Sequence, residues 1–166
     1  MNDEENITEA AQLITTGDFI AAMAVFERHI EANPDDPAGY HGWAEAALFE
    51  IQQNGNLDES GNDRINEGKV TAYLRRAAGL APDNADYSAA YASALVEFDR
   101  IPMAVSQLHK LVELGKASNE VDVSFHLYEA ARGLIEANDL KTNVDRSAPR
   151  VRQDIRDALE FALLGL

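Results

Sequence analysis

Hydrophobic side chains recur along this chain at the spacing of amphipathic helices. Between residues 19 and 32 the large apolar side chains lie three or four positions apart, which places them on one face of an α-helix. These side chains belong to Phe19, Met23, Phe26 and Ile30. Pro34 ends the pattern, because proline lacks an N–H group and clashes with the preceding turn.

Similar apolar stripes follow along the rest of the chain, separated by turn-forming residues. They predict helices at about 38–51, 67–81, 87–98, 102–114, 120–137 and 148–163. The segment before Gly17 has a weaker helical pattern. Between the helices ending near Ile51 and starting near Glu67, Asn, Asp, Gly and Ser dominate, which predicts a loop.

Parts of this pattern repeat. Residues 17–36 comprise a Gly-Asp-aromatic turn, an amphipathic helix and an Asn-Pro-Asp-Asp end; residues 74–84 repeat the end and residues 100–108 repeat the start. The next helix carries a large-small-small set, Trp43, Ala44 and Ala47. The chain therefore resembles the tetratricopeptide repeat family. The resemblance implies an all-α fold of antiparallel helix hairpins, stacked as a short right-handed superhelix of about 7–8 helices.

The repeats set the expected organisation. Pro34 and Pro82 close equivalent helices but lie 48 residues apart, whereas the family period is about 34, so the second repeat is expected to hold an insertion of about 14 residues. The chain is predicted to be one domain, 1–166. Its parts are repeat one at about 3–36, repeat two at about 37–84 with an insertion loop at about 52–66, repeat three at about 85–116, and a degenerate hairpin with a C-terminal capping helix at about 119–166. His29 departs from the small residue that the family prefers and is expected to be partly buried.

The resemblance also implies a binding surface, because the first helices of successive repeats line a concave groove in this family. The matching positions in the second and third repeats are His41, Glu45, Leu48, Phe49, Asp86, Ala89, Ser93, Val96 and Glu97. In the first repeat they are Glu4, Ile7, Ala11 and Ile14. Chaperone-binding family members hold a partner's C-terminal carboxylate there with Lys and Asn. This chain has Ile7, Ala11, His41 and Glu45 instead, so no acidic tail is expected to bind.

Charge points to the opposite kind of partner. Residues 1–63 hold 14 Asp and Glu against one basic residue, Arg28, and so account for −13 of the net −15. Such a field repels nucleic acid and anionic lipid and attracts basic segments. The groove is therefore predicted to bind a basic, partly apolar protein or peptide, with no nucleic acid or membrane partner. The alternative is that the surplus only serves solubility.

Few residues suggest chemistry of another kind. The chain has no Cys and no nucleotide-binding, nucleophile-elbow or zinc-protease motif, so no catalytic residue, cofactor or metal is predicted. The four His are on different predicted helices. Residues 56–67 echo a calcium-binding EF-hand loop, with oxygen-bearing side chains at positions 1, 3 and 5, Gly at 6 and Glu at 12. Asn56 at position 1 and Asp63 at position 8 depart from that pattern. A solvated insertion loop is the preferred interpretation.

Three functions remain open: a noncatalytic adaptor or scaffold, a dedicated client chaperone similar to those of bacterial secretion systems, and an accessory subunit of a larger assembly. The C-terminal residues 161–166 are apolar and are expected either to cap the repeats or to contact a partner or a second copy, giving a homodimer. No segment is apolar for the roughly 18 residues that a membrane span needs. The acidic start, residues 1–6, is unlike a signal peptide, so the chain is predicted to be cytoplasmic.

Overall fold

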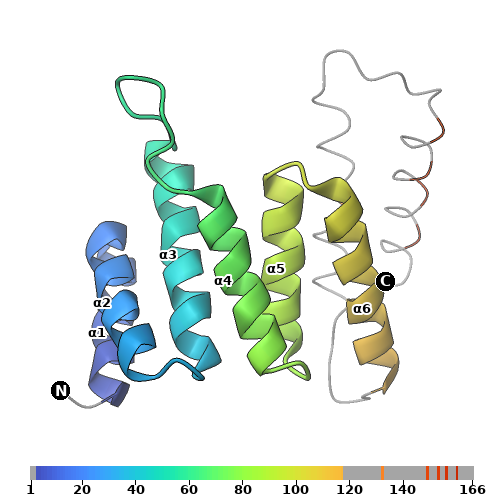
Figure 1. The fold of residues 1–166 in the computed structure, drawn as a ribbon, viewed down its shortest axis with the longest axis horizontal. Coiled ribbons are helices and arrows are strands. Elements are labelled where there is room, and N and C mark those ends of the chain that lie inside the picture. The colour runs from blue at the N-terminus through green and yellow to red at the C-terminus, as the bar shows by residue number, and fades with distance from the viewer. Residues whose placement is uncertain are drawn as a thin grey trace. The chain divides into compact units, whose positions relative to one another are not determined.

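The computed structural model describes residues 3–117 and, beyond them, only the isolated residues 132, 149, 153, 156 and 160. The described range contains six α-helices and no strand (Figure 1). They are α1 (Asp3–Thr16), α2 (Phe19–Ala32), α3 (Pro37–Asn54), α4 (Glu67–Leu80), α5 (Ala85–Glu97) and α6 (Ile101–Ala117). The prediction of an all-α fold is confirmed. The degenerate hairpin and the capping helix predicted at 119–166 lie outside the described residues.

The chain divides into two compact units, Met1–Ala81 and Pro82–Leu166. In the first unit, α1 packs against α2, α2 against α3 and α3 against α4, and α1 also touches α3. In the second unit, α5 packs against α6. The predicted pairing of consecutive helices into hairpins is therefore seen within each unit. No helix in residues 3–117 is long and apolar enough to cross a membrane.

Short polar side chains start most of these helices. An N-terminal cap accepts a hydrogen bond from a backbone N–H that has no partner within the helix. Oxygens of Asp18, Asp36, Asn66 and Asn84 accept from the backbone N–H groups of Ala21, Ala38, Lys69 and Tyr87. Pro37 occupies the first turn of α3, where the missing N–H costs nothing. The Asp of the Gly-Asp turn and the last Asp of the Asn-Pro-Asp-Asp end therefore cap the helices that follow them.

The α3 helix extends three residues beyond the sequence expectation, so the insertion loop spans residues 55–66 instead of about 52–66. Gln52, Gln53 and Asn54 are polar and therefore do not continue the apolar pattern, but they continue the helix. It ends at Gly55, which has a φ of 73°. Figure 1 shows the loop extending beyond the ends of α3 and α4.

Glycines on α3 let α2 approach closely. A Cβ atom built on Gly42 would lie 2.2 Å from the Phe26 ring, and one on Gly39 would lie 2.9 Å from Cδ2 of His29. Such distances are far inside van der Waals contact. His29 is only 1% exposed, so it is more deeply buried than the sequence suggested. Gly39 of α3 therefore leaves the space that the His29 side chain of α2 fills.

Candidate protein-binding surface

The predicted binding residues divide between the two units. His41, Glu45, Leu48 and Phe49 lie on α3 of the first unit, and Asp86, Ala89, Ser93, Val96 and Glu97 lie on α5 of the second. Each set is therefore described within its own unit.

In the first unit, the structure brings Ile14 of α1 and Phe49 of α3 into one hydrophobic cluster. The cluster is built on the buried residues Phe19, Ala22 and Ala46, and the partly buried Leu13, Ile14, Met23 and Phe49 pack against it. The rings of Phe19 and Phe49 have centroids 5.6 Å apart, tilted by 35°. The α1 and α3 helices thus share an apolar surface that is only partly covered.

Both helices that carry this apolar surface also carry carboxylates. Neither α1 nor α3 contains a Lys or Arg. Glu45 is exposed on α3, and its carboxylate forms no ion pair with a described residue. The ion pairs of the first unit link other carboxylates, at Glu9, Glu27, Asp35 and Glu50, to Arg28, Lys69, Arg76 and Arg64. Glu45 is therefore an exposed acid of α3 with no counter-ion among the described residues, whereas Glu9 of α1 and Glu50 of α3 are paired with Arg28 and Arg64.

The other predicted residues of this surface differ in exposure. His41 and Leu48 of α3 are partly buried, as are Ile7 and Ile14 of α1, and Ala11 is exposed. The Glu4 side chain lies outside the described residues.

In the second unit, the structure separates the predicted residues by burial. Asp86, Ser93 and Glu97 are exposed, whereas Ala89 is 4% exposed and Val96 9%. Ala89 and Val96 lie two turns apart on the same side of α5 as the buried Ala85 and Ala92, so they belong to the buried stripe of this helix. Only the three polar members of the set are available on the surface of α5.

Two potential cation ligands of the insertion loop, Asn56 and Asp58, are engaged in other bonds. The Asn56 amide donates from Nδ2 to the Ile65 carbonyl and accepts from the Ile65 N–H, at 3.0 and 2.8 Å. Oδ1 of Asp58 accepts from the N–H groups of Ser60 and Asn62, each at 2.8 Å. The Asn62 backbone bond is the main reason that the pKa of Asp58 is lowered. Within the described part of the chain, no group of three or more His, Cys, Asp or Glu could hold a metal ion.

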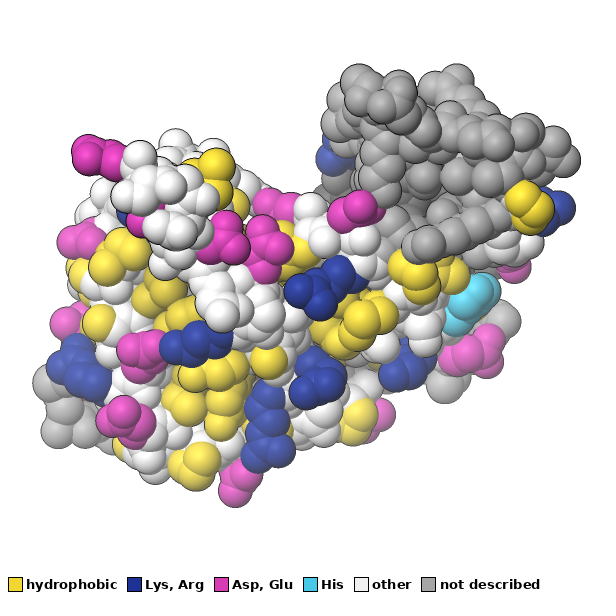
Figure 2. All heavy atoms as spheres, turned by 45° about the horizontal axis from the view of Figure 1, so that its top comes forward, with side chains coloured by type: hydrophobic (Ala, Val, Ile, Leu, Met, Phe, Trp, Pro, Cys, Tyr) yellow, Lys and Arg dark blue, Asp and Glu magenta, His cyan; other side chains and the backbone are white. Residues whose placement is uncertain are grey.

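Sequence reasoning missed an aromatic and cationic seam between α2, α3 and α4. Nζ of Lys69 lies 4.3 Å from the Trp43 ring centroid and donates to Oε1 of Glu27 at 2.6 Å. The Trp43 indole N–H donates to the same oxygen at 3.2 Å, and the Tyr73 ring packs edge-on against Trp43. The i, i+4 spacing of Lys69 and Tyr73 was the available signal. Figure 2 shows hydrophobic side chains at the surface between Lys, Arg and acidic side chains.

Comparisons with known proteins identify the fold. The chain matches no protein-family model and no curated protein. Solved structures similar to it include MamA from Desulfovibrio magneticus RS-1, at a TM-score of 0.66 and 13% identity over 99% of this chain and 73% of that one. The TPR2B domain of yeast Sti1, solved in complex with pHsp70, has a TM-score of 0.65 and 16% identity over 84% of this chain and 98% of that one.

The Yersinia enterocolitica type III secretion translocator chaperone SycD is a further similar structure. It has a TM-score of 0.63 and 14% identity, over 85% of this chain and 95% of that one. At these identities the similarity establishes the fold and does not transfer a partner. The chain has a tetratricopeptide-repeat-like fold, as its repeated motifs predicted.

Proposed function

We propose that this protein is a noncatalytic adaptor or scaffold that binds a basic, partly apolar segment of a partner protein. The observation that supports this best is the α1–α3 surface, where the cluster around Phe49 and Ile14 lies on helices that contain carboxylates and no Lys or Arg. The fold supports the same proposal, because helical-repeat proteins use extended surfaces to hold other proteins.

The two parts of the surface have different tasks in this proposal. Apolar contacts with Phe49, Leu48 and Ile14 contribute most of the affinity, because burial of large apolar side chains dominates binding energy at protein interfaces. Glu45 selects basic segments and speeds encounter, since exposed charges act mainly on specificity and association rate. In the second unit, the exposed Asp86 and Glu97 of α5 are assigned the same preference for basic segments.

The proposal assigns no catalytic step and no cofactor to any of these residues. Partner identification comes first: affinity purification from the native cell with mass spectrometry should recover a protein with a basic, partly apolar segment. A synthetic peptide of that segment is then titrated into the purified chain by calorimetry.

Reversal of charge tests the surface. We expect the Glu45→Lys and Glu97→Lys double variant to abolish binding of the partner peptide without loss of helicity, because a lysine facing a basic segment replaces attraction with repulsion. The control is Glu31→Lys at an exposed position of α2, which makes the same charge change as Glu45→Lys alone. Equal binding by the double variant and the control would remove the surface from consideration.

A dedicated client chaperone is the second candidate, favoured by the similarity to SycD over 95% of that chain. Co-expression separates the two functions. A chaperone should render one otherwise insoluble client soluble, whereas a scaffold should join components that are stable without it. Soluble expression of the partner alone would exclude the chaperone function.

A further inference from the structure

The insertion loop, residues 55–66, is an ordered element. Leu57 and Asp63 form an antiparallel bridge, and the Asp58 N–H donates to the Asn62 carbonyl at 2.9 Å. Gly61, at a φ of 79°, makes the tight turn and donates its N–H to the Asp58 carbonyl. The loop is therefore a small hairpin with most of its turn groups bonded internally.

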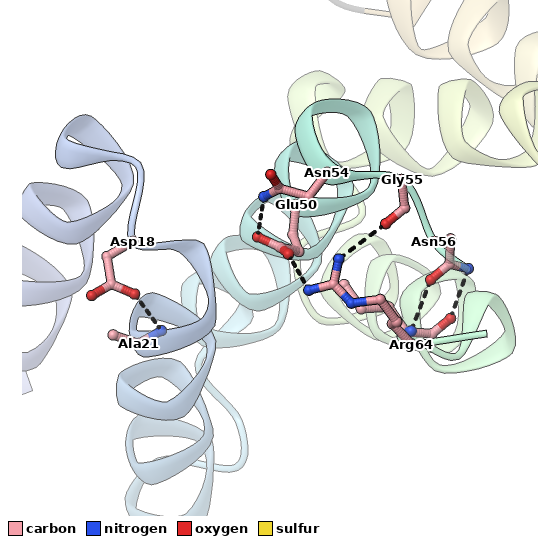
Figure 3. Close-up of polar contacts among 8 residues, drawn as sticks. Asp18, Ala21, Glu50, Asn54, Gly55, Asn56 and Arg64 are labelled. Atoms are coloured by element: carbon pink, nitrogen blue, oxygen red, sulfur yellow. Dashed lines mark hydrogen bonds and ion pairs between the residues drawn. The ribbon is translucent and has the colours of Figure 1, made fainter. Parts of the chain in front are cut away.

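The base of the loop is anchored to α3 by a buried charge. Glu50 is 5% exposed, and its Oε1 accepts from the Arg64 guanidinium at 2.6 Å (Figure 3). Arg64 also donates to the Gly55 carbonyl, and Asn54 donates to the other Glu50 oxygen. A buried carboxylate is costly without its partner, so Arg64 is held in place. Ile65, 5% exposed, adds an apolar anchor beside the two Asn56 bonds.

The outer part of the loop has a different character. Leu57 is 65% exposed, more than either of the other exposed large hydrophobic residues of the described chain, Ile20 and Met103. Asp58, Glu59 and Asp63 are exposed within six residues of it, and the one basic residue of the loop, Arg64, is turned to Glu50. Leu57 is thus an exposed leucine on an ordered hairpin backbone, in a loop that also exposes three carboxylates.

We propose that this loop is a preformed docking element, in which Leu57 packs on the apolar stripe of a basic amphipathic segment while Asp58, Glu59 and Asp63 contact the Lys or Arg side chains that border the stripe. The loop would be a second contact site for the same class of partner, a basic, partly apolar segment. The proposal rests on the proposed function only for that partner class. It does not require the α1–α3 surface.

Two physical arguments select this occupant. A loop whose backbone is already ordered loses less conformational freedom on binding than a mobile one would. Three exposed carboxylates, whose one basic neighbour in the loop, Arg64, is paired with Glu50, repel acidic segments and attract basic ones. A second copy of this chain, with a net charge of −15, is disfavoured by the same charge.

The test is an NMR titration of the ¹⁵N-labelled full chain with a synthetic helical peptide of alternating Leu and Lys faces. Backbone amide shifts of residues 57–63 should move at saturable peptide concentrations. A Ser/Lys peptide of equal charge and a Leu/Glu peptide of opposite charge should leave these amides nearly unmoved. Equal loop shifts with the Ser/Lys peptide would show attraction without a role for Leu57 and would overturn the proposal.

Variants of the loop sharpen the result. Leu57→Ser should weaken the binding measured at loop amides by about tenfold, as expected for loss of a central apolar contact. The Glu59→Gln and Asp63→Asn double variant should weaken it and reduce its salt dependence, while leaving the Asp58 turn intact. Ile20→Ser removes an equally large exposed side chain from α2 and should change nothing at the loop.

The location of the shifts separates this proposal from the preceding one. Shifts confined to α1 and α3 would overturn the loop proposal and support the proposed function. Shifts confined to residues 57–63 would support the loop proposal and contradict the α1–α3 surface as the binding site. Shifts in neither region would contradict both proposals.

Discussion

Each of the two connections at the ends of α3 supplies a charged partner for a buried ionisable residue of a neighbouring helix. The short α2–α3 turn places Asp36 beside His29, with Nε2 donating to Oδ2 at 2.7 Å. The long α3–α4 loop places Arg64 beside Glu50, at 2.6 Å. In both, a buried ionisable residue of a helix bonds a charged residue of the connection, and both helix residues are at most 5% exposed.

The difference lies in how completely each buried group is satisfied. Glu50 receives donors from Arg64 and Asn54. His29 has one side-chain partner, and its Nδ1 is buried without a hydrogen bond among the described residues. An unpaired polar atom such as His29 Nδ1 costs far less to bury than an unpaired carboxylate at Glu50 would. The longer connection therefore needs, and has, the more complete network.

The largest effect is expected where a buried charge loses its partner. Arg64→Met should lower the free energy of unfolding by about 3 kcal/mol, because it leaves the Glu50 carboxylate buried and unpaired. Urea denaturation followed by circular dichroism measures this. The Glu50→Gln and Arg64→Met double variant is the control, since it removes the charge as well and should recover a large part of the loss. Equal stability of the two variants would show that the ion pair does not anchor the loop.

A smaller effect is expected at the α2–α3 turn, where packing and hydrogen bonding are coupled. Gly39→Ala should cost about 2 kcal/mol, because the added methyl group meets His29 and Ile30 in a filled space. His29→Ala should also destabilise the fold, through a cavity and the loss of the Asp36 bond. Together they should cost less than their sum by about 1 kcal/mol, because the smaller side chain at 29 makes room for the methyl group. Thermal or urea unfolding of all four proteins completes this cycle, and strict additivity would contradict the steric account.

The smallest effect is expected at the exposed tip of the loop. Backbone donors, that of Asn62 first, hold the pKa of Asp58 below its ordinary value of 3.8. A depressed folded pKa means that the contribution to stability is present above the ordinary pKa and is lost as pH falls through the lower, folded value. Amide shifts of Ser60 and Asn62 should therefore change in strongly acidic solution, below pH 3.8, in an NMR titration. Asp58→Asn should abolish this transition, and its persistence in that variant would assign it elsewhere.

Local signals were sufficient for much of the fold. The apolar stripe of α2, the caps at Asp18 and Asp36 and the stop at Pro34 each act within a few residues, so their positions in the structure follow from the sequence. The boundary at Asn54 was missed because polar residues can continue a helix when the turn that ends it, here Gly55, comes later.

The candidate surface was less predictable. Position within a repeat placed Glu45 on the surface, but it also selected Ala89 and Val96, which the structure buries. Helical periodicity assigns a residue to a direction around its helix, and burial in that direction depends on what packs there. The insertion loop looked solvated by composition, yet Asn56 and Arg64 order it through contacts with Ile65 and Glu50.

The sequence by itself determined the helices, their hairpin pairing and the acidic character of the first unit, because periodicity, capping and charge are properties of neighbouring residues. The tertiary structure alone decided that His29 and Glu50 are buried and paired, that Gly39 and Gly42 let α2 pack closely against α3, and that Leu57 is exposed to solvent. Each of these depends on atoms brought together from different helices or from opposite ends of a loop, whose distances only the packed chain defines.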